Sequence, residues 1–280
     1  MPRHAVLLAA VFAATAVLST PVAAAAPAAT TLDDWACRPA VAHPNPVVLL
    51  HGTLNGVREW DQLTPDLTAQ GYCVFALDYG YSALPILRST GLGPLAESAD
   101  QVAAFIDRVL TATGADKVDI VGQSQGGALA EYFAKNMGHA DRVGVEVLLA
   151  PPTHGTTLSG VVDILPPGSP QRVAADAAVP VLACPACTDM ETGSTFVKAL
   201  NDGPITQSGV RYAVIATRDD TTVTPPGTAS FINEPGVANV FVQDLHPGIR
   251  VEHAALPSHP VIRRWILQQL DPATANSNAG

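Results

Sequence analysis

Basic residues are scarce in this sequence. Its 280 residues include 15 Lys and Arg against 25 Asp and Glu, so the formal net charge is -10 at neutral pH. Proteins that bind nucleic acid need clustered Lys and Arg side chains to neutralise the phosphates. We therefore expect no nucleic-acid partner.

The sequence also lacks an apolar run that would serve as a membrane anchor. The run near the N-terminus covers residues 5–18, which is shorter than the roughly 20 residues that a transmembrane helix needs. Arg3, this run and the small residues that end near position 26 have the order of a secretory signal peptide. We expect residues 1–28 to be a signal peptide, the protein to be secreted and extracellular, and the mature chain to have no transmembrane segment.

Cysteine is rare, with four residues in the chain. In an exported protein four cysteines favour two disulfides, for which three pairings exist. We favour Cys37 with Cys73, which ties the N-terminal segment to a predicted strand, and Cys184 with Cys187, which closes a short loop. Half of a zinc site or a redox motif is the alternative for the second pair, but no further pair of cysteines supports it.

Apolar, β-branched runs alternate with helical patterns in the rest of the chain, and no internal repeat or linker divides it. The predicted strands are 47–50, 73–77, 118–121, 145–149, 212–216 and 240–242, and the predicted helices are 96–112, 126–136 and 261–270. Near-continuous apolar strands between helices are typical of a parallel sheet buried on both faces. We expect residues 29–280 to form a single α/β domain, a mostly parallel central sheet flanked by helices on both faces.

Two segments fit neither pattern, 79–95 and 153–180. Both combine Gly and Pro with apolar residues, and long loops in a compact domain are usually functional or mobile. The second contains Leu158, Val161, Val162, Ile164 and Leu165, which either line an acyl pocket or lid, or pack on the surface. We treat both segments as lid candidates.

The strongest motif is Gly122-Gln123-Ser124-Gln125-Gly126, between a predicted strand and a predicted helix. A serine at such a sharp turn has a strained backbone, and glycines two residues before and after it keep side chains from colliding with the strand and the helix. The turn presents the serine hydroxyl at the carboxyl edge of the sheet. Ser124 is therefore the predicted nucleophile, and a purely structural turn is the alternative.

A nucleophilic serine needs an acid and a histidine, which follow it in that order in this arrangement. Strand 212–216 is followed by Asp219 and Asp220. We predict Asp220 as the acid, because a hydrophobic residue and then a proline follow it. Asp219 is expected to point to solvent, as a turn residue or as an ion-pair partner of Arg218.

Three histidines follow the last predicted strand: His246, His253 and His259. His246 lies too near that strand for a loop to return it to the serine. His259 precedes Pro260 and resembles a helix start. We predict His253 as the general base, with His259 in reserve.

The oxyanion hole needs backbone N–H groups directed at the developing negative charge. One is expected from Gln125, the residue after the nucleophile. The other is expected from Thr53, in the loop after strand 47–50, with a further contribution from its hydroxyl. His51, in the same turn, is expected to be structural.

Taken together, these motifs resemble extracellular actinobacterial lipases and, more distantly, the yeast lipase B type with its Ser-Gln-Gly-Gly turn. The resemblance rests on the stretches 45–53, 71–80, 122–127, 149–157, 184–187, 215–220 and 252–253, and so covers nearly the whole mature chain. It implies the α/β-hydrolase fold, with Ser124, Asp220 and His253 as a catalytic triad, and Thr53 and Gln125 as oxyanion donors.

The chain departs from these lipases at two positions. Gln123 stands where many lipases have His or Trp, and Asp219 stands where related chains often carry an aromatic residue. The first departure puts the alcohol side of the pocket in question, and the second puts the shape of the acid loop in question.

The expected function is that of a secreted lipase or esterase that hydrolyses carboxylic esters, acylglycerols included, through an acyl-enzyme. Its expected partner is an ester or lipid substrate, met in part at a lipid–water interface, and no metal or organic cofactor is implied. The alternatives are an acyltransferase or polyester hydrolase with the same triad, and a non-catalytic protein that kept the hydrolase scaffold.

Overall fold

The computed structural model describes residues 31–81, 90–164, 168–173 and 184–271. The expected signal peptide, residues 1–28, lies outside the described residues, as do parts of both lid candidates.

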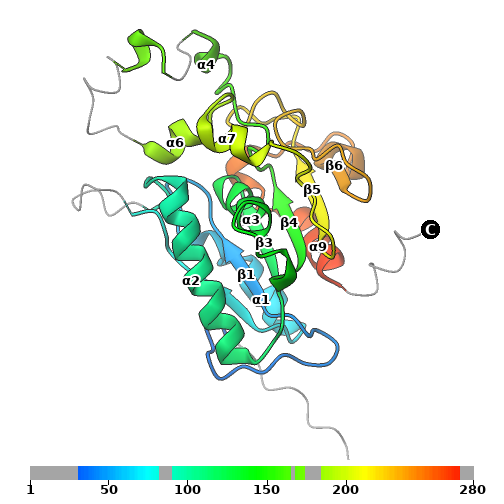
Figure 1. The fold of residues 1–280 in the computed structure, drawn as a ribbon. Coiled ribbons are helices and arrows are strands. Elements are labelled where there is room, and N and C mark those ends of the chain that lie inside the picture. Colours follow the sequence, from blue (N-terminus) through cyan, green and yellow to red (C-terminus); the bar gives the residue numbers. More distant parts are fainter. Residues whose placement is uncertain (1–30, 82–89, 165–167, 174–183, 272–280) are drawn as a thin grey trace, which may run out of the picture.

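Six strands form one sheet, and every neighbouring pair is parallel (Figure 1). In spatial order they are β2 (Val74–Ala76), β1 (Val47–Leu50), β3 (Val118–Gln123), β4 (Val143–Leu149), β5 (Arg211–Ala216) and β6 (Ala238–Phe241). The sheet agrees with the α/β fold predicted from the alternating pattern. Because all strands are parallel, their carboxyl ends meet at one edge, where the loops that follow β1, β3 and β5 come together.

The longer helices are α1 (Leu63–Ala69), α2 (Leu95–Thr113), α3 (Gln125–Lys135) and α9 (Pro260–Leu270). Shorter ones are α4 (Val161–Ile164), α6 (Pro185–Asp189), α7 (Thr195–Leu200) and α8 (Val242–Leu245), together with the 3-10 turns η1 (Val57–Trp60), η3 (Ala140–Arg142) and η5 (His253–Ala255). α9 begins as predicted, with Pro260 in its first turn and His259 as its N-cap.

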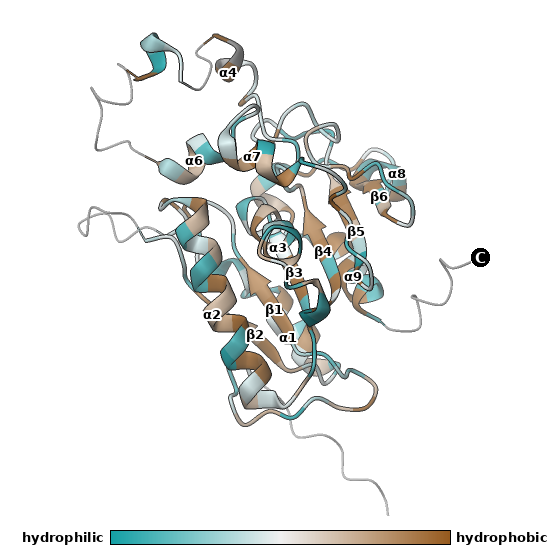
Figure 2. Cartoon of the chain, in the orientation of Figure 1, coloured by the Kyte–Doolittle hydropathy of each residue, from teal (hydrophilic) through white to brown (hydrophobic). Residues whose placement is uncertain are grey.

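The sheet is buried on both faces. Val48, Leu50 and Ile120 pack with α2 and α3 in one apolar cluster, whereas Val47 and Leu49 pack with α1 and α9 in the other. Successive residues of a strand point to opposite faces, so both sets must be apolar. Figure 2 shows these strands in hydrophobic colours between helices that carry hydrophilic residues as well.

Both predicted disulfides are present, Cys37–Cys73 and Cys184–Cys187. The first joins the segment before β1 to the residue before β2 across a sequence separation of 36. The second joins the N-cap of α6 to a residue within that helix. Within the described ranges, the helices are too short or too polar to cross a membrane.

Candidate active site

Ser124 lies at the turn between β3 and α3, with a φ of 52° and a ψ of -119°. This backbone conformation is unfavourable for a residue with a side chain and is found mainly where the surroundings impose it. The flanking glycines explain how the turn is imposed. A Cβ atom at Gly122 would lie 2.6 Å from the backbone of Gly126, and one at Gly126 would lie 2.1 Å from the carbonyl oxygen of Leu50.

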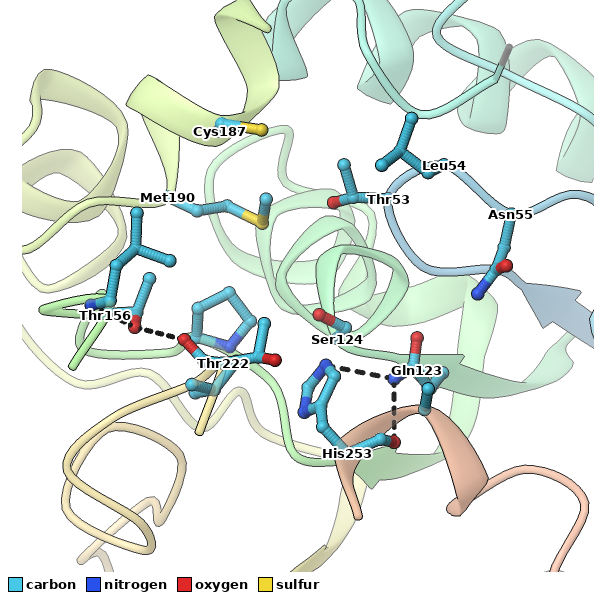
Figure 3. A pocket seen from close by; sticks show the side chains of 14 residues that line it. Thr53, Leu54, Asn55, Gln123, Ser124, Thr156, Cys187, Met190, Thr222 and His253 are labelled. Atoms are coloured by element: carbon cyan, nitrogen blue, oxygen red, sulfur yellow. Dashed lines mark hydrogen bonds between the residues drawn. The ribbon is translucent and has the colours of Figure 1, made fainter. Parts of the chain in front are cut away.

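A pocket of about 330 Å³ opens at this turn, and Thr53, Gln123, Ser124 and His253 line it (Figure 3). Its apolar lining includes Leu54, Pro152, Leu158, Met190, Val223 and Ala254. Ser124 is only 6% exposed. The little surface that it has therefore belongs to the pocket wall, which is where a substrate would meet it.

His253 begins the 3-10 turn η5 and reaches Asp220, which follows β5. Its Nδ1 lies 2.7 Å from Asp220 Oδ2. The other oxygen of Asp220 accepts the backbone N–H groups of Thr222 and Val223, each at 2.8 Å. Asp220 is thus fixed within its own turn, and a proton on His253 Nδ1 leaves the Nε2 lone pair of the neutral ring free to accept one.

Gln123 contacts that second nitrogen. Its Nε2 lies 3.1 Å from His253 Nε2 and 3.5 Å from the carbonyl oxygen of His253 (Figure 3). Among the described residues, the hydrogen bond at His253 Nε2 comes from Gln123 rather than from the Ser124 hydroxyl. Catalytic hydrogen bonds are often long or misaligned without a substrate. The sequence marked Gln123 as unusual, but it gave no sign of this contact across 130 positions.

The two predicted oxyanion donors lie side by side. Thr53 Oγ1 donates a hydrogen bond of 2.7 Å to Gln125 Oε1, and Gln125 is fully buried at the start of α3. A Cβ atom at Gly52 would lie 3.5 Å from Ser124 Cβ, so the loop of Thr53 runs directly past the serine.

The prediction that Asp219 points to solvent is wrong. Asp219 Oδ2 accepts the backbone N–H of Val251 at 3.1 Å, and Arg218 pairs with Asp244 instead, at 2.8 Å. The Thr217 hydroxyl donates to the carbonyl oxygen of Val251 at 2.6 Å. Val251 thus uses both its backbone N–H and its carbonyl oxygen to bind the residues that follow β5. These two bonds hold the segment that leads to His253 against the end of β5.

The two alternative candidates for the base, and His51, lie in other environments. His259 Nδ1 accepts the N–H of Val261 at 3.3 Å and so caps α9, and His246 is exposed at the end of α8. His51 is buried and stacks on Tyr79 with 4.1 Å between ring centroids, and burial lowers its pKa. His51 therefore has the structural character that the sequence indicated.

The second lid candidate divides between the pocket and the surface. Leu158 lines the pocket and Val162 is buried, whereas Ile164 is 80% exposed. Leu165 lies outside the described residues. In the part of the chain that the structure describes, no group of three or more His, Cys, Asp or Glu side chains is arranged to hold a metal ion.

Two curated proteins resemble part of this chain in sequence. A triacylglycerol lipase from Burkholderia plantarii is 35% identical over 117 residues, which cover 40% of this chain and 29% of that protein. One from Pseudarthrobacter phenanthrenivorans is 35% identical over 95 residues, covering 32% of this chain and 28% of that protein. The match thus spans less than a third of the length of either relative.

Solved structures resemble the whole fold at low sequence identity. Lipase B from Aspergillus fumigatus has a TM-score of 0.60 and 17% identity, over 83% of this chain and 55% of that one. A Bacillus licheniformis lipase in its mature form has a TM-score of 0.57 and 15% identity, over 84% of this chain and 94% of that one. Such a likeness establishes the fold alone.

The sequence pattern of the alpha/beta hydrolase fold family matches residues 45–227, from the strand before Thr53 to the loop after Asp220. This range is well over half of the chain and contains both the turn of Ser124 and the strands β1 to β5. The chain therefore belongs to the alpha/beta hydrolase fold family.

Proposed function

We propose that this protein is a secreted serine hydrolase that cleaves carboxylic esters, as a lipase or esterase. The observation that carries the proposal is the position of His253, whose Nδ1 contacts Asp220 while its ring faces the pocket that Ser124 lines. The names of the two matched relatives, both triacylglycerol lipases, support an ester of a fatty acid as the substrate.

In the proposed reaction the Ser124 hydroxyl attacks the ester carbonyl carbon while His253 Nε2 takes its proton. Asp220 keeps the proton of His253 on Nδ1 and stabilises the imidazolium that forms. The backbone N–H groups of Thr53 and Gln125 hold the oxyanion. His253 then gives the proton to the departing alcohol, and a water molecule, activated by the same ring, releases the acid from Ser124.

Gln123 enters this cycle at one point. The neutral ring has a single lone pair on Nε2, so the Ser124 hydroxyl must replace the Gln123 amide there before the proton moves. Until then, the Gln123 amide favours the tautomer that carries its proton on Nδ1, which is the form that the reaction needs.

The size of the pocket favours short or medium acyl chains. Its volume of about 330 Å³ lies near the lower end of the 300–1,000 Å³ that ligand pockets usually have. We expect p-nitrophenyl butyrate and octanoate to be hydrolysed with a higher kcat/KM than the palmitate. A profile that rises steadily to palmitate would contradict this expectation.

Secretion is the cellular side of the proposal. It is supported by the order of residues in the first 28 positions and by two disulfides, which persist mainly in oxidising compartments. N-terminal sequencing of protein from the culture medium tests it. A mature chain that begins near residue 29 is expected, and a chain retained in the cell with its first residues intact would count against secretion.

Substitution of the serine tests the enzyme activity. Ser124→Ala in the purified protein should lower p-nitrophenyl ester turnover by at least about 10³-fold, since the substitution removes the attacking hydroxyl. Turnover that survives the substitution would refute the assignment. A non-catalytic scaffold would show no turnover in the wild type either, and an acyltransferase would form a new ester when alcohol is added.

A further inference from the structure

Glu59 forms hydrogen bonds to the oxyanion loop, residues 51–55. It lies in η1, which follows the loop directly, and both of its carboxylate oxygens bond to the loop. Oε2 accepts the backbone N–H of Gly52 at 2.7 Å, and Oε1 accepts the side-chain amide of Asn55 at 2.8 Å. The reaction proposed above does not use this carboxylate.

The loop needs such support because it is irregular. Leu54 has a φ of 64°, which is unfavourable for a residue with a side chain. The Gly52 N–H that Glu59 accepts lies one residue before the N–H of Thr53. The Gly52 backbone also lies against Ser124 and the Gln123 side chain, so a shift of this peptide would move Thr53 relative to the serine. An oxyanion donor acts only within about 2.7–3.1 Å of the oxygen.

η1 has an anchor of its own, which separates the role of Glu59 from that of a general structural residue. The backbone N–H of Val57, at the start of η1, donates to Asp78 Oδ1 at 2.7 Å. Trp60, at its end, is fully buried. η1 is therefore attached by residues other than Glu59, and the two bonds of Glu59 tie the loop to this anchored turn.

The environment of Glu59 is costly for a charge. Burial raises the pKa of this carboxyl to about 7, against the opposing effect of the hydrogen bonds from Gly52 and Asn55. An apolar side chain of similar size would avoid that desolvation cost. The carboxylate nevertheless lies beside the loop, where its two hydrogen bonds fix the positions of Gly52 and Asn55.

We propose that Glu59 is a positioning residue for the oxyanion hole, whose carboxylate fixes the Gly52–Thr53 segment relative to Ser124. This inference rests on the proposed function, because it assumes that Thr53 supplies an oxyanion donor. An oxyanion forms only in the transition state and the intermediate. We therefore expect substitution of Glu59 to change kcat and to have little effect on KM.

Three substitutions in the purified full chain test the proposal with p-nitrophenyl butyrate. Glu59→Leu removes both acceptors at similar volume and should lower kcat about 10- to 100-fold, with KM within about twofold of the wild type. Glu59→Gln keeps one oxygen for Gly52, and its amide can donate to Asn55 once the Asn55 amide turns over. It should recover most of the lost kcat. Glu59→Asp keeps the charge but withdraws it from Gly52, and should lower kcat about tenfold.

Asp119 supplies a matched control. It also accepts one side-chain amide, from Asn45 at 2.9 Å, and one backbone N–H, from Val145 at 3.1 Å. It is 6% exposed but lies near the start of β3, at the opposite end of the strand from Ser124. Asp119→Leu should lower Tm while leaving kcat per folded molecule within about twofold of the wild type.

The outcomes separate the two proposals. If Ser124→Ala retains turnover, the proposed function fails. If Ser124→Ala is inactive but Glu59→Leu keeps a wild-type kcat, or loses no more than Asp119→Leu per folded molecule, only the role of Glu59 is overturned. Should Glu59→Leu not fold, Glu59→Asp decides: a kcat equal to that of the wild type overturns the proposal, and a fall with unchanged KM supports it.

Discussion

Asp219 and Asp220 are neighbours in one turn, yet they contact different parts of the molecule. Asp220 contacts the ring of His253, whereas Asp219 accepts the backbone N–H of Val251, which lies two residues before His253. One carboxylate therefore orients the imidazole, and the other holds the segment that carries it. Removal of either should slow the reaction, but by different amounts.

We expect Asp220→Ala to lower kcat by about 10³- to 10⁴-fold, because the imidazole loses both its orientation and the charge that stabilises the imidazolium. Asp219→Ala should lower kcat only about tenfold, because Asp220 and the Thr217 contact with Val251 still hold His253. Steady-state kinetics of both variants on one ester measure the order. The reverse order would mean that Asp219 is the acid.

The sequence allowed Ser124, Asp220 and His253 to be chosen because each follows a predicted strand in a fixed order. Short-range reasoning failed for Asp219, whose partner lies 32 positions away, and for the contact between Gln123 and His253. These contacts depend on how loops pack in space. No local pattern encodes that packing.

At the scale of elements, long apolar strands and long amphipathic helices were predictable to within about two residues at most ends. The predicted helix 96–112, for example, corresponds to α2 (Leu95–Thr113), which ends at Gly114 with a left-handed backbone. Strand β6, predicted at 240–242, spans Ala238–Phe241 and is shifted at both ends, because an edge strand with half-buried residues has a weaker apolar pattern. Short helices such as α6 and α7 have too few turns to show a period.

The two disulfides should differ in their effect on stability. Cys37–Cys73 constrains a sequence separation of 36, and Cys184–Cys187 one of 3. On the loop-entropy estimate the first stabilises by about 4 kcal/mol and the second by about 2. Urea unfolding of Cys37→Ser/Cys73→Ser and of Cys184→Ser/Cys187→Ser measures how much unfolding free energy each variant loses.

The short disulfide has a second consequence, because Cys187 and Met190 line the pocket. Its removal should change KM for the ester more than removal of the long one does. Equal losses of stability would contradict the loop-entropy estimate. An unchanged KM in Cys184→Ser/Cys187→Ser would show that α6 keeps its position without the bond.

For the molecule as a whole, buried acids link stability to pH. Glu131 of α3 and Glu146 of β4 are almost completely buried, and burial raises the pKa of Glu131 to about 8 and that of Glu146 well above its usual value. Thr153 donates a hydrogen bond to Glu131 at 2.6 Å, which opposes the effect only in part. The folded protein therefore keeps protons that the unfolded chain releases.

The sign of the pH effect follows from these raised pKa values. The ordinary pKa of Glu131 is 4.5 and its folded value about 8, so its contribution is fully present below pH 4.5 and is lost as the pH rises through 8. Each such group lowers the free energy of unfolding by roughly 1 kcal/mol for each pH unit in that window. Urea unfolding of wild type and Glu131→Gln at pH 5, 7 and 8.5 tests this. The variant should show a shallower decline, and identical slopes would refute the assignment.

The proposed mechanism requires that the hydroxyl of Ser124 is the nucleophile and that His253 activates it. Reaction of the purified protein with a fluorophosphonate probe, followed by mass spectrometry of its peptides, tests both parts at once. We predict one adduct, on Ser124, and a labelling rate at least about 10²-fold lower in His253→Ala. An adduct on another residue, or the same labelling rate with and without the imidazole, would contradict this mechanism.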